Sequence, residues 1–257
     1  MEMTTSPIVK RLFLGAMSAV AVLTLSACGQ QTDDQNAATS TSSAQTTSTA
    51  SEVTAMKGDE LDKILEDTKK KEKYLVLDVR KAEDYQAGTV KYAVNVPTDE
   101  IDAKADSLAD YKDKNVVTIA DTKEDSEKAA KALMDKGVTK VMNADGMKDF
   151  NYTVITKVQF VLADALVKAA ESGDYTIIDS RDEKDYNAGH LKGAKHIDVN
   201  NLDEEIKSIP KDKPVMSYCY SGNKAYKAAQ KLVDEGWTNV FTANDGTKEH
   251  DYDLVTD

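Results

Sequence analysis

The chain has little cysteine, little histidine and a deficit of positive charge. Only two cysteines, Cys28 and Cys219, occur in 257 residues, which excludes a framework of several disulfides. The three histidines, His190, His196 and His250, match no common zinc-binding spacing. We therefore expect neither a bound metal nor a cofactor.

Basic residues are outnumbered, with 33 Lys and Arg against 45 Asp and Glu, for a net charge of −12. Proteins that bind nucleic acid or anionic membrane surfaces usually carry basic patches. We expect no nucleic-acid partner. A small anionic substrate would need a local cationic pocket within this negative field.

The first 27 residues have the layout of a secretory signal. Lys10 and Arg11 precede an apolar run over residues 12–25, and Ser26 and Ala27 stand before Cys28. The run is shorter than the roughly 20 residues that span a bilayer. This segment resembles a bacterial lipoprotein signal, which implies cleavage after residue 27 and lipidation of Cys28.

Residues 30–51 are rich in Ser, Thr, Ala and Gln, a composition typical of a chain that cannot bury a core. We interpret residues 28–52 as the lipidated cysteine followed by a flexible tether. The resemblance implies an exported protein anchored through Cys28 to the outer face of a membrane. Cys219 would then be the only thiol of the mature chain.

The rest of the chain is an internal repeat. Residues 75–80 match residues 176–181, and residues 84–88 match residues 185–189. Order and spacing persist over a whole domain length, which is too long for a solenoid unit. We place the two copies at residues 53–152 and 153–257.

Strands alternate with helices in both copies, which predicts an α/β fold with a mainly parallel sheet and helices on both of its faces. In the second copy we expect a first strand at 156–158 and a first helix at 160–171. Ligands of such sheets bind beyond the carboxyl ends of the strands.

Cys219 falls at such an end. An apolar strand over residues 214–218 precedes it, and a Ser-Gly loop and a helix over residues 224–235 follow. The free backbone N–H groups and the dipole at a helix N-terminus stabilise a thiolate and bind anions. Cys219 is the candidate nucleophile.

Three segments of the second copy resemble the rhodanese family: 178–181 (Ile-Asp-Ser-Arg), 185–194 (Asp-Tyr-Asn-Ala-Gly-His-Leu-Lys-Gly-Ala) and 218–225 (Tyr-Cys-Tyr-Ser-Gly-Asn-Lys-Ala). The resemblance covers residues 53–257 as two tandem rhodanese-like domains. It implies a thiosulfate sulfurtransferase-like enzyme in which Cys219 takes a sulfane sulfur from an anionic donor and passes it to a thiol or cyanide. The loop that would cradle the sulfur comprises Tyr220, Ser221, Gly222, Asn223, Lys224 and Ala225.

Two positions bear on donor binding. The family commonly has arginine where this chain has Lys224, and lysine lacks the bidentate geometry that suits an oxyanion. Arg181 is a further candidate for substrate binding, although its recurrence as Arg80 in the first copy favours a structural ion pair with Asp179.

The first copy has Ala120 where the second has Cys219, and acidic side chains follow at Asp121, Glu124 and Asp125. We expect this copy to repel thiosulfate and to serve a structural or regulatory role. Two other functions remain open for a chain that we expect to be monomeric: a non-catalytic surface-anchored binding module, and a thiol redox or persulfide sensor.

Overall fold

The computed structural model describes residues 53–256. The predicted signal segment, Cys28 and the tether lie outside these residues. Within residues 53–256, no helix is both long and apolar enough to cross a membrane.

The first copy contains six strands and four α-helices. In chain order they are β1 (Thr54–Met56), α1 (Gly58–Glu66), β2 (Tyr74–Asp78), α2 (Ala82–Ala87), β3 (Thr89–Val90), β4 (Ala93–Asn95), α3 (Ile101–Ala109), β5 (Asn115–Ile119), α4 (Lys123–Asp135) and β6 (Val141–Ala144). A short 3₁₀ turn, Lys71–Lys73, precedes β2.

The second copy repeats this order with two differences: the additional strand β7 precedes it, and no strand within residues 153–256 corresponds to β3. Its elements are β7 (Ile155–Thr156), β8 (Gln159–Val161), α5 (Ala163–Ser172), β9 (Thr176–Asp179), α6 (Glu183–Ala188), β10 (Lys195–His196), α7 (Leu202–Glu205), β11 (Val215–Tyr218), α8 (Asn223–Asp234) and β12 (Val240–Ala243).

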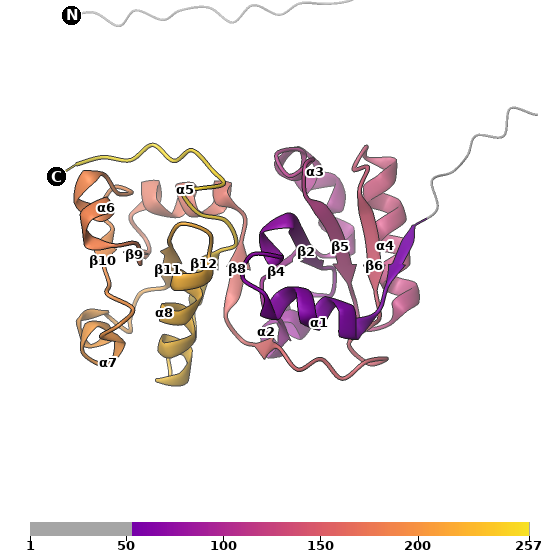
Figure 1. Ribbon diagram of the computed structural model, residues 1–257, viewed down its shortest axis with the longest axis horizontal. Coiled ribbons are helices and arrows are strands. Elements are labelled where there is room, and N and C mark those ends of the chain that lie inside the picture. The colour runs from indigo at the N-terminus through magenta and orange to yellow at the C-terminus, as the bar shows by residue number, and fades with distance from the viewer. Residues whose placement is uncertain (1–52, 257) are drawn as a thin grey trace, which may run out of the picture. The chain divides into compact units, whose positions relative to one another are not determined.

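Ten strands form one sheet, in the order β1-β6-β5-β2-β4-β8-β12-β11-β9-β10, and every pairing in it is parallel (Figure 1). The predicted α/β fold with a mainly parallel sheet is confirmed. The five strands of each copy have the same order, and the two sets join where β4 pairs with β8 through Val94 and Phe160. β3 and β7 form a separate antiparallel pair that also links the copies.

The core of the second copy lies on both faces of its strands. Ile177 and Met216 pack with Leu166 of α5 in one apolar cluster. Their strand neighbours Ile178 and Val215 belong to another cluster, together with residues of α8 and of the first copy. Successive side chains of a strand point to opposite faces, so α5 and α8 cover opposite faces of the sheet.

The predicted start of the second copy is wrong in detail. We expected a strand at 156–158 and a helix from residue 160, but Phe160 lies in β8 and α5 begins at Ala163. The reason is tertiary, because Phe160 is buried where the two copies join and pairs with Val94.

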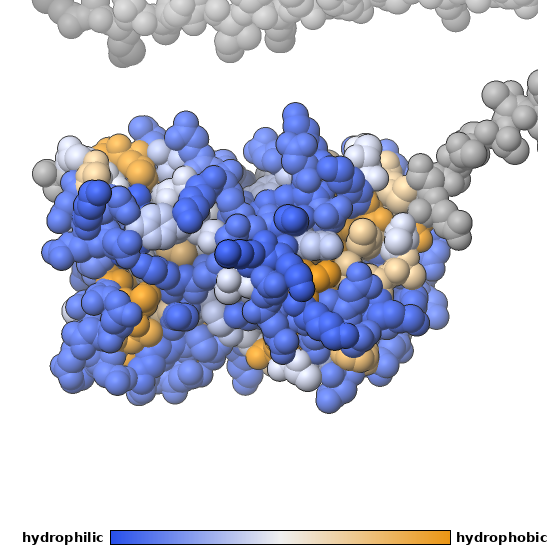
Figure 2. Space-filling view, viewed as in Figure 1, coloured by the Kyte–Doolittle hydropathy of each residue, from blue (hydrophilic) through white to orange (hydrophobic). Residues whose placement is uncertain are grey.

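The face seen in Figure 2 is mostly hydrophilic, with small apolar areas between charged side chains. This agrees with a chain in which 30% of the residues are charged.

Candidate active site

Cys219 directly follows β11, and its side chain is buried, with only 1% of the residue exposed. The chain turns through Gly222, which has a φ of +78° and caps the N-terminus of α8. A Cβ atom on Gly222 would lie 2.7 Å from the backbone oxygen of Asn244. The positive φ and this close approach both require glycine at the turn.

The loop side chains point in different directions. The Tyr220 hydroxyl donates to the Asp185 carboxylate and accepts from the backbone N–H of Asp182, so this ring faces α6. Ser221 is buried, and its hydroxyl accepts from the Asn223 amide. The buried Ala225 accepts at its carbonyl from the Ser217 hydroxyl. Tyr220 therefore turns its hydroxyl away from the loop, whereas Ser221 bonds within the loop and Ala225 bonds to β11.

Lys224 and Arg181 both line a cavity of about 390 Å³, and its lining also includes His196 and Asp198. The Lys224 ammonium pairs with Asp182 at 2.5 Å and is about one-third exposed. The Arg181 guanidinium donates to both oxygens of Asp179 and to the Gly189 carbonyl. The cavity offers two cations beside the loop, although Cys219 is not among its lining residues.

Asp179 and Arg181 are braced further by Tyr218. The Tyr218 hydroxyl donates to Asp179 at 2.7 Å and accepts from the Leu191 N–H at 2.9 Å. Burial and the negative charge of Asp179 raise the pKa of Tyr218, which keeps its hydroxyl a donor. The role of Arg181 in substrate binding stays a prediction.

The first copy contributes side chains to this site that the sequence analysis did not identify. Lys71 is buried, and its ammonium donates to the backbone oxygens of Ser221 at 2.5 Å and Asn244 at 3.0 Å. The Tyr92 hydroxyl donates to the side-chain oxygen of Asn223 at 2.7 Å. Lys71 and Tyr92 therefore bond to Ser221 and Asn223, the second and fourth residues after Cys219.

Tyr92 has a φ of +67° and is the only described non-glycine residue with a positive φ. In the repeat it stands opposite Gly193, whose φ is +73°. The Tyr92 ring packs against Phe160 and Tyr226, at centroid distances of 5.3 and 5.7 Å. A tyrosine stands where the second copy has a glycine, and its strained backbone places the side chain against the second copy.

Charged groups from both copies meet at residues 245–249, which lie beside the Cys219 loop. Lys114 of the first copy pairs with Asp245 at 2.8 Å and with Glu249 at 3.3 Å, and these three side chains are at most 16% exposed. Burial raises the pKa of Glu249, and Lys114 opposes that shift. Burial lowers the pKa of Lys71, an effect that Glu249 opposes.

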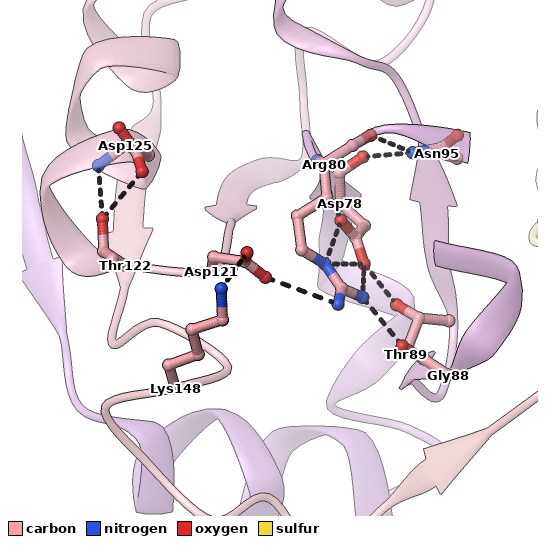
Figure 3. Close-up of polar contacts among 9 residues, drawn as sticks. All are labelled: Asp78, Arg80, Gly88, Thr89, Asn95, Asp121, Thr122, Asp125 and Lys148. Atoms are coloured by element: carbon pink, nitrogen blue, oxygen red, sulfur yellow. Dashed lines mark hydrogen bonds and ion pairs between the residues drawn. The ribbon is translucent and has the colours of Figure 1, made fainter. Parts of the chain in front are cut away.

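The corresponding region of the first copy is a cavity of about 570 Å³ whose lining includes Arg80, Ala120, Asp121 and Asp125. Figure 3 shows that Asp121 lies between Lys148, at 2.6 Å, and the Arg80 guanidinium, at 3.8 Å. The first copy thus has an ion-paired aspartate one residue beyond Ala120, where the second copy has Tyr220.

Residues 53–256 contain no group of three or more His, Cys, Asp or Glu side chains placed to hold a metal ion.

Comparison with known proteins identifies the domains. The Rhodanese-like domain profile matches residues 58–150 and 162–250. Thiosulfate sulfurtransferase GlpE of Pseudomonas fluorescens is 39% identical over 70 residues, which are 27% of this chain and 64% of the relative. The same-named protein of Pseudomonas entomophila is 37% identical over 82 residues, 32% of this chain and 73% of the relative.

Among solved structures, the thiosulfate sulfurtransferase of Pseudomonas aeruginosa is 15% identical, with a TM-score of 0.34 over 76% of this chain and 41% of that chain. A rhodanese of E. coli solved with anions is 30% identical, with a TM-score of 0.30 over 33% of this chain and 98% of that chain.

Proposed function

Because this chain belongs to the rhodanese-like family, with two copies of the domain in tandem, we propose that it is a sulfurtransferase whose nucleophile is Cys219. The observation that carries the proposal is the position of this thiol, directly after β11 and before the N-terminus of the twelve-residue helix α8. Backbone N–H groups and the helix dipole at that position favour a thiolate and an anionic leaving group.

With thiosulfate as donor, the Cys219 thiolate attacks the outer sulfur. The new S–S bond forms as the bond between that sulfur and the sulfite sulfur breaks, and sulfite leaves with the electron pair. In the second half-reaction, a thiolate or cyanide attacks the outer sulfur of the persulfide, and Cys219 leaves as the thiolate. No other oxidant or reductant is required.

The donor belongs to the proposal as well. The similar Pseudomonas proteins are named thiosulfate sulfurtransferases, which supports thiosulfate or another small sulfane-sulfur anion. Lys224 and Arg181 supply positive charge in the neighbouring cavity. Because Lys224 is already paired with Asp182 and lacks the arginine fork, we expect thiosulfate to bind weakly.

The test is intact-mass analysis of the protein after incubation with thiosulfate at neutral pH, with Cys219→Ala as the matched control. We expect the wild-type protein to gain one sulfur atom that cyanide removes, and the variant to gain none. If neither thiosulfate nor a small persulfide donor adds sulfur to Cys219, the chain is not a sulfurtransferase.

One observation favours a second function. Cys219 is only 1% exposed, as expected of a non-catalytic rhodanese-fold binding module with an inert thiol. Very slow alkylation of Cys219 in the folded protein, together with no sulfur uptake, would support the module. Alkylation much faster than global unfolding would support the enzyme.

Membrane attachment is a separate part of the proposal and rests on the sequence alone. Cys28 would carry the lipid and hold the two domains at the outer face of a membrane. Metabolic labelling with a fatty acid would detect the modification, and Cys28→Ser should abolish it.

A further inference from the structure

An insertion in the first copy brings Lys71 to the catalytic loop of the second. Seven residues, 67–73, separate α1 from β2, whereas three residues, 173–175, separate α5 from β9 at the corresponding place. Lys71 lies in the longer connection, 150 residues before Ser221. The copy without a cysteine therefore has a longer segment of its own whose Lys71 side chain contacts the loop of the other copy.

Only two of the three N–H donors of the Lys71 ammonium have hydrogen-bond partners among the described residues, and both partners are backbone oxygens. The group is 3% exposed. The ammonium also lies over the Tyr92 ring, 4.7 Å from its centroid. The carbonyls and the ring are neutral, so no paired anion among the described residues balances the desolvation of the ammonium.

A second buried donor, the Tyr252 hydroxyl, lies in the part of the second copy that holds Cys219. Tyr252 is 6% exposed, and among residues 53–256 its hydroxyl has no hydrogen-bond partner. Its counterpart in the first copy, Tyr152, donates to the Asp145 carbonyl at 2.6 Å. The Tyr252 ring packs against the ring of Tyr218, the residue before Cys219, at a centroid distance of 6.0 Å. A buried hydroxyl that is satisfied in one copy and unsatisfied in the other points to a partner that the protein acquires at Cys219.

We propose that Lys71 of the first copy and Tyr252 of the second are the side-chain donors that stabilise the negative sulfur of Cys219, as thiolate and as persulfide. This inference rests on the proposed function for its persulfide part, whereas the thiolate part stands independently. The copy without a cysteine then takes a direct part in the reaction. Because Lys224 is paired with Asp182, the cation that stabilises the sulfur comes from Lys71 of the first copy.

The surroundings are consistent with this assignment. The charged groups near Lys71 are Glu249, Lys114, Asp245, Cys219 and Lys91, and the Lys91 ammonium lies over the same Tyr92 ring. Lys114 pairs with both carboxylates at short distance. Among residues 53–256, Lys71 forms no ion pair with either of them, so its ammonium is an unpaired cation at the Cys219 loop. Burial and the neighbouring negative charges raise the pKa of Tyr252, so its hydroxyl keeps the proton that it would donate.

The test measures thiolate formation directly. In the full-length protein carrying Cys28→Ser, Cys219 is the only thiol, and its thiolate absorbance can be followed against pH after subtraction of Cys219→Ser. For Lys71→Met we expect the midpoint to rise by about one pH unit, which is tenfold less thiolate below the midpoint. Lys73→Met is the matched control, because Lys73 is exposed on the same turn, and it should leave the midpoint unchanged.

Tyr252→Phe keeps the assignment testable if Lys71→Met fails to fold, since it removes no hydrogen bond present in the structure. We expect a raised midpoint and at least threefold slower persulfide formation from thiosulfate, with no loss of stability. Tyr152→Phe, its counterpart, should lose stability without a change in the midpoint.

Unchanged midpoints in both Lys71→Met and Tyr252→Phe would overturn the inference, even if the wild-type protein forms a persulfide. Shifted midpoints without sulfur uptake would instead uphold the thiolate donors and contradict the proposed function.

Discussion

At the scale of single residues, two glycines of the second copy differ in how well they should tolerate a side chain. Gly222 and Gly193 both have a positive φ, +78° and +73°, but only Gly222 has another backbone where a Cβ atom would be. Gly193 has no atom within 4 Å of that position. Alanine substitutions at the two positions therefore distinguish the cost of backbone strain alone from the cost of strain together with steric overlap.

We predict that Gly193→Ala lowers the free energy of unfolding by about 1 kcal/mol, the cost of a left-handed conformation for an L-residue. Gly222→Ala should cost about 2 kcal/mol more, because the 2.7 Å approach to Asn244 forces a backbone shift. Urea unfolding of both variants checks the difference, and equal losses would show that the loop adjusts freely.

A second residue-scale prediction concerns Glu249. Burial raises its pKa in the folded protein, so the folded state holds this proton more tightly than the unfolded chain does. The free energy of unfolding therefore falls as the pH rises from the unfolded to the folded pKa of this carboxyl, and at higher pH the loss is complete.

Glu249→Gln removes that titration. We expect the variant to be at least as stable as the wild-type protein at neutral pH, with the difference declining as the pH is lowered through the carboxylate range. Unfolding midpoints measured over a pH series test this. A neutral-pH loss of stability in the variant would mean that the pair with Lys114 outweighs the desolvation.

At the scale of elements, the junction of β4 with β8 depends on one tyrosine. The buried Tyr85 hydroxyl donates to the Ala93 carbonyl at 2.9 Å and accepts from the Phe160 N–H at 2.7 Å. Tyr186, its counterpart, makes the equivalent bond to Ala194 at 2.9 Å, beside the edge strand β10. Tyr85 therefore connects two copies, whereas this bond of Tyr186 stays within one.

We predict that Tyr85→Phe lowers the free energy of unfolding by about 1–3 kcal/mol, because it leaves a buried donor and a buried acceptor without partners. Tyr186→Phe should cost about 0.5–1.5 kcal/mol. Thermal unfolding of both variants gives the comparison, and a smaller loss for Tyr85→Phe would show that the junction does not need the hydroxyl.

The sequence predicted the elements better than the contacts between them. Repeated segments indicated the strand and helix order, and they placed Cys219 at the carboxyl end of β11. The contact of Lys71 with Ser221 spans 150 residues, and no local pattern indicates such a partner. One signal was available, because Tyr92 stands where the second copy has a glycine, but without a φ value it could not be read as strain.

At the scale of the whole molecule, the two copies share one sheet and one continuous apolar cluster. Residues of α1, α4 and α8 belong to the same buried cluster. We predict that residues 53–256 unfold in a single cooperative transition, because separation would expose β8, Phe160 and the ion pairs of Lys114. Coincident urea transitions by circular dichroism and by Trp237 fluorescence test this, and two separate steps would contradict it.

The burial of Cys219 between groups of both copies also affects how long a persulfide at this residue would survive. A persulfide held at this thiol would be shielded from stray thiols and from peroxide, which convert exposed sulfur to disulfides or to irreversible acids. We therefore expect the persulfide to persist on Cys219 in the interval between reaction with the donor and reaction with the acceptor. A long-lived loaded form would make this protein a sulfur reservoir, able to meet its two substrates at different moments.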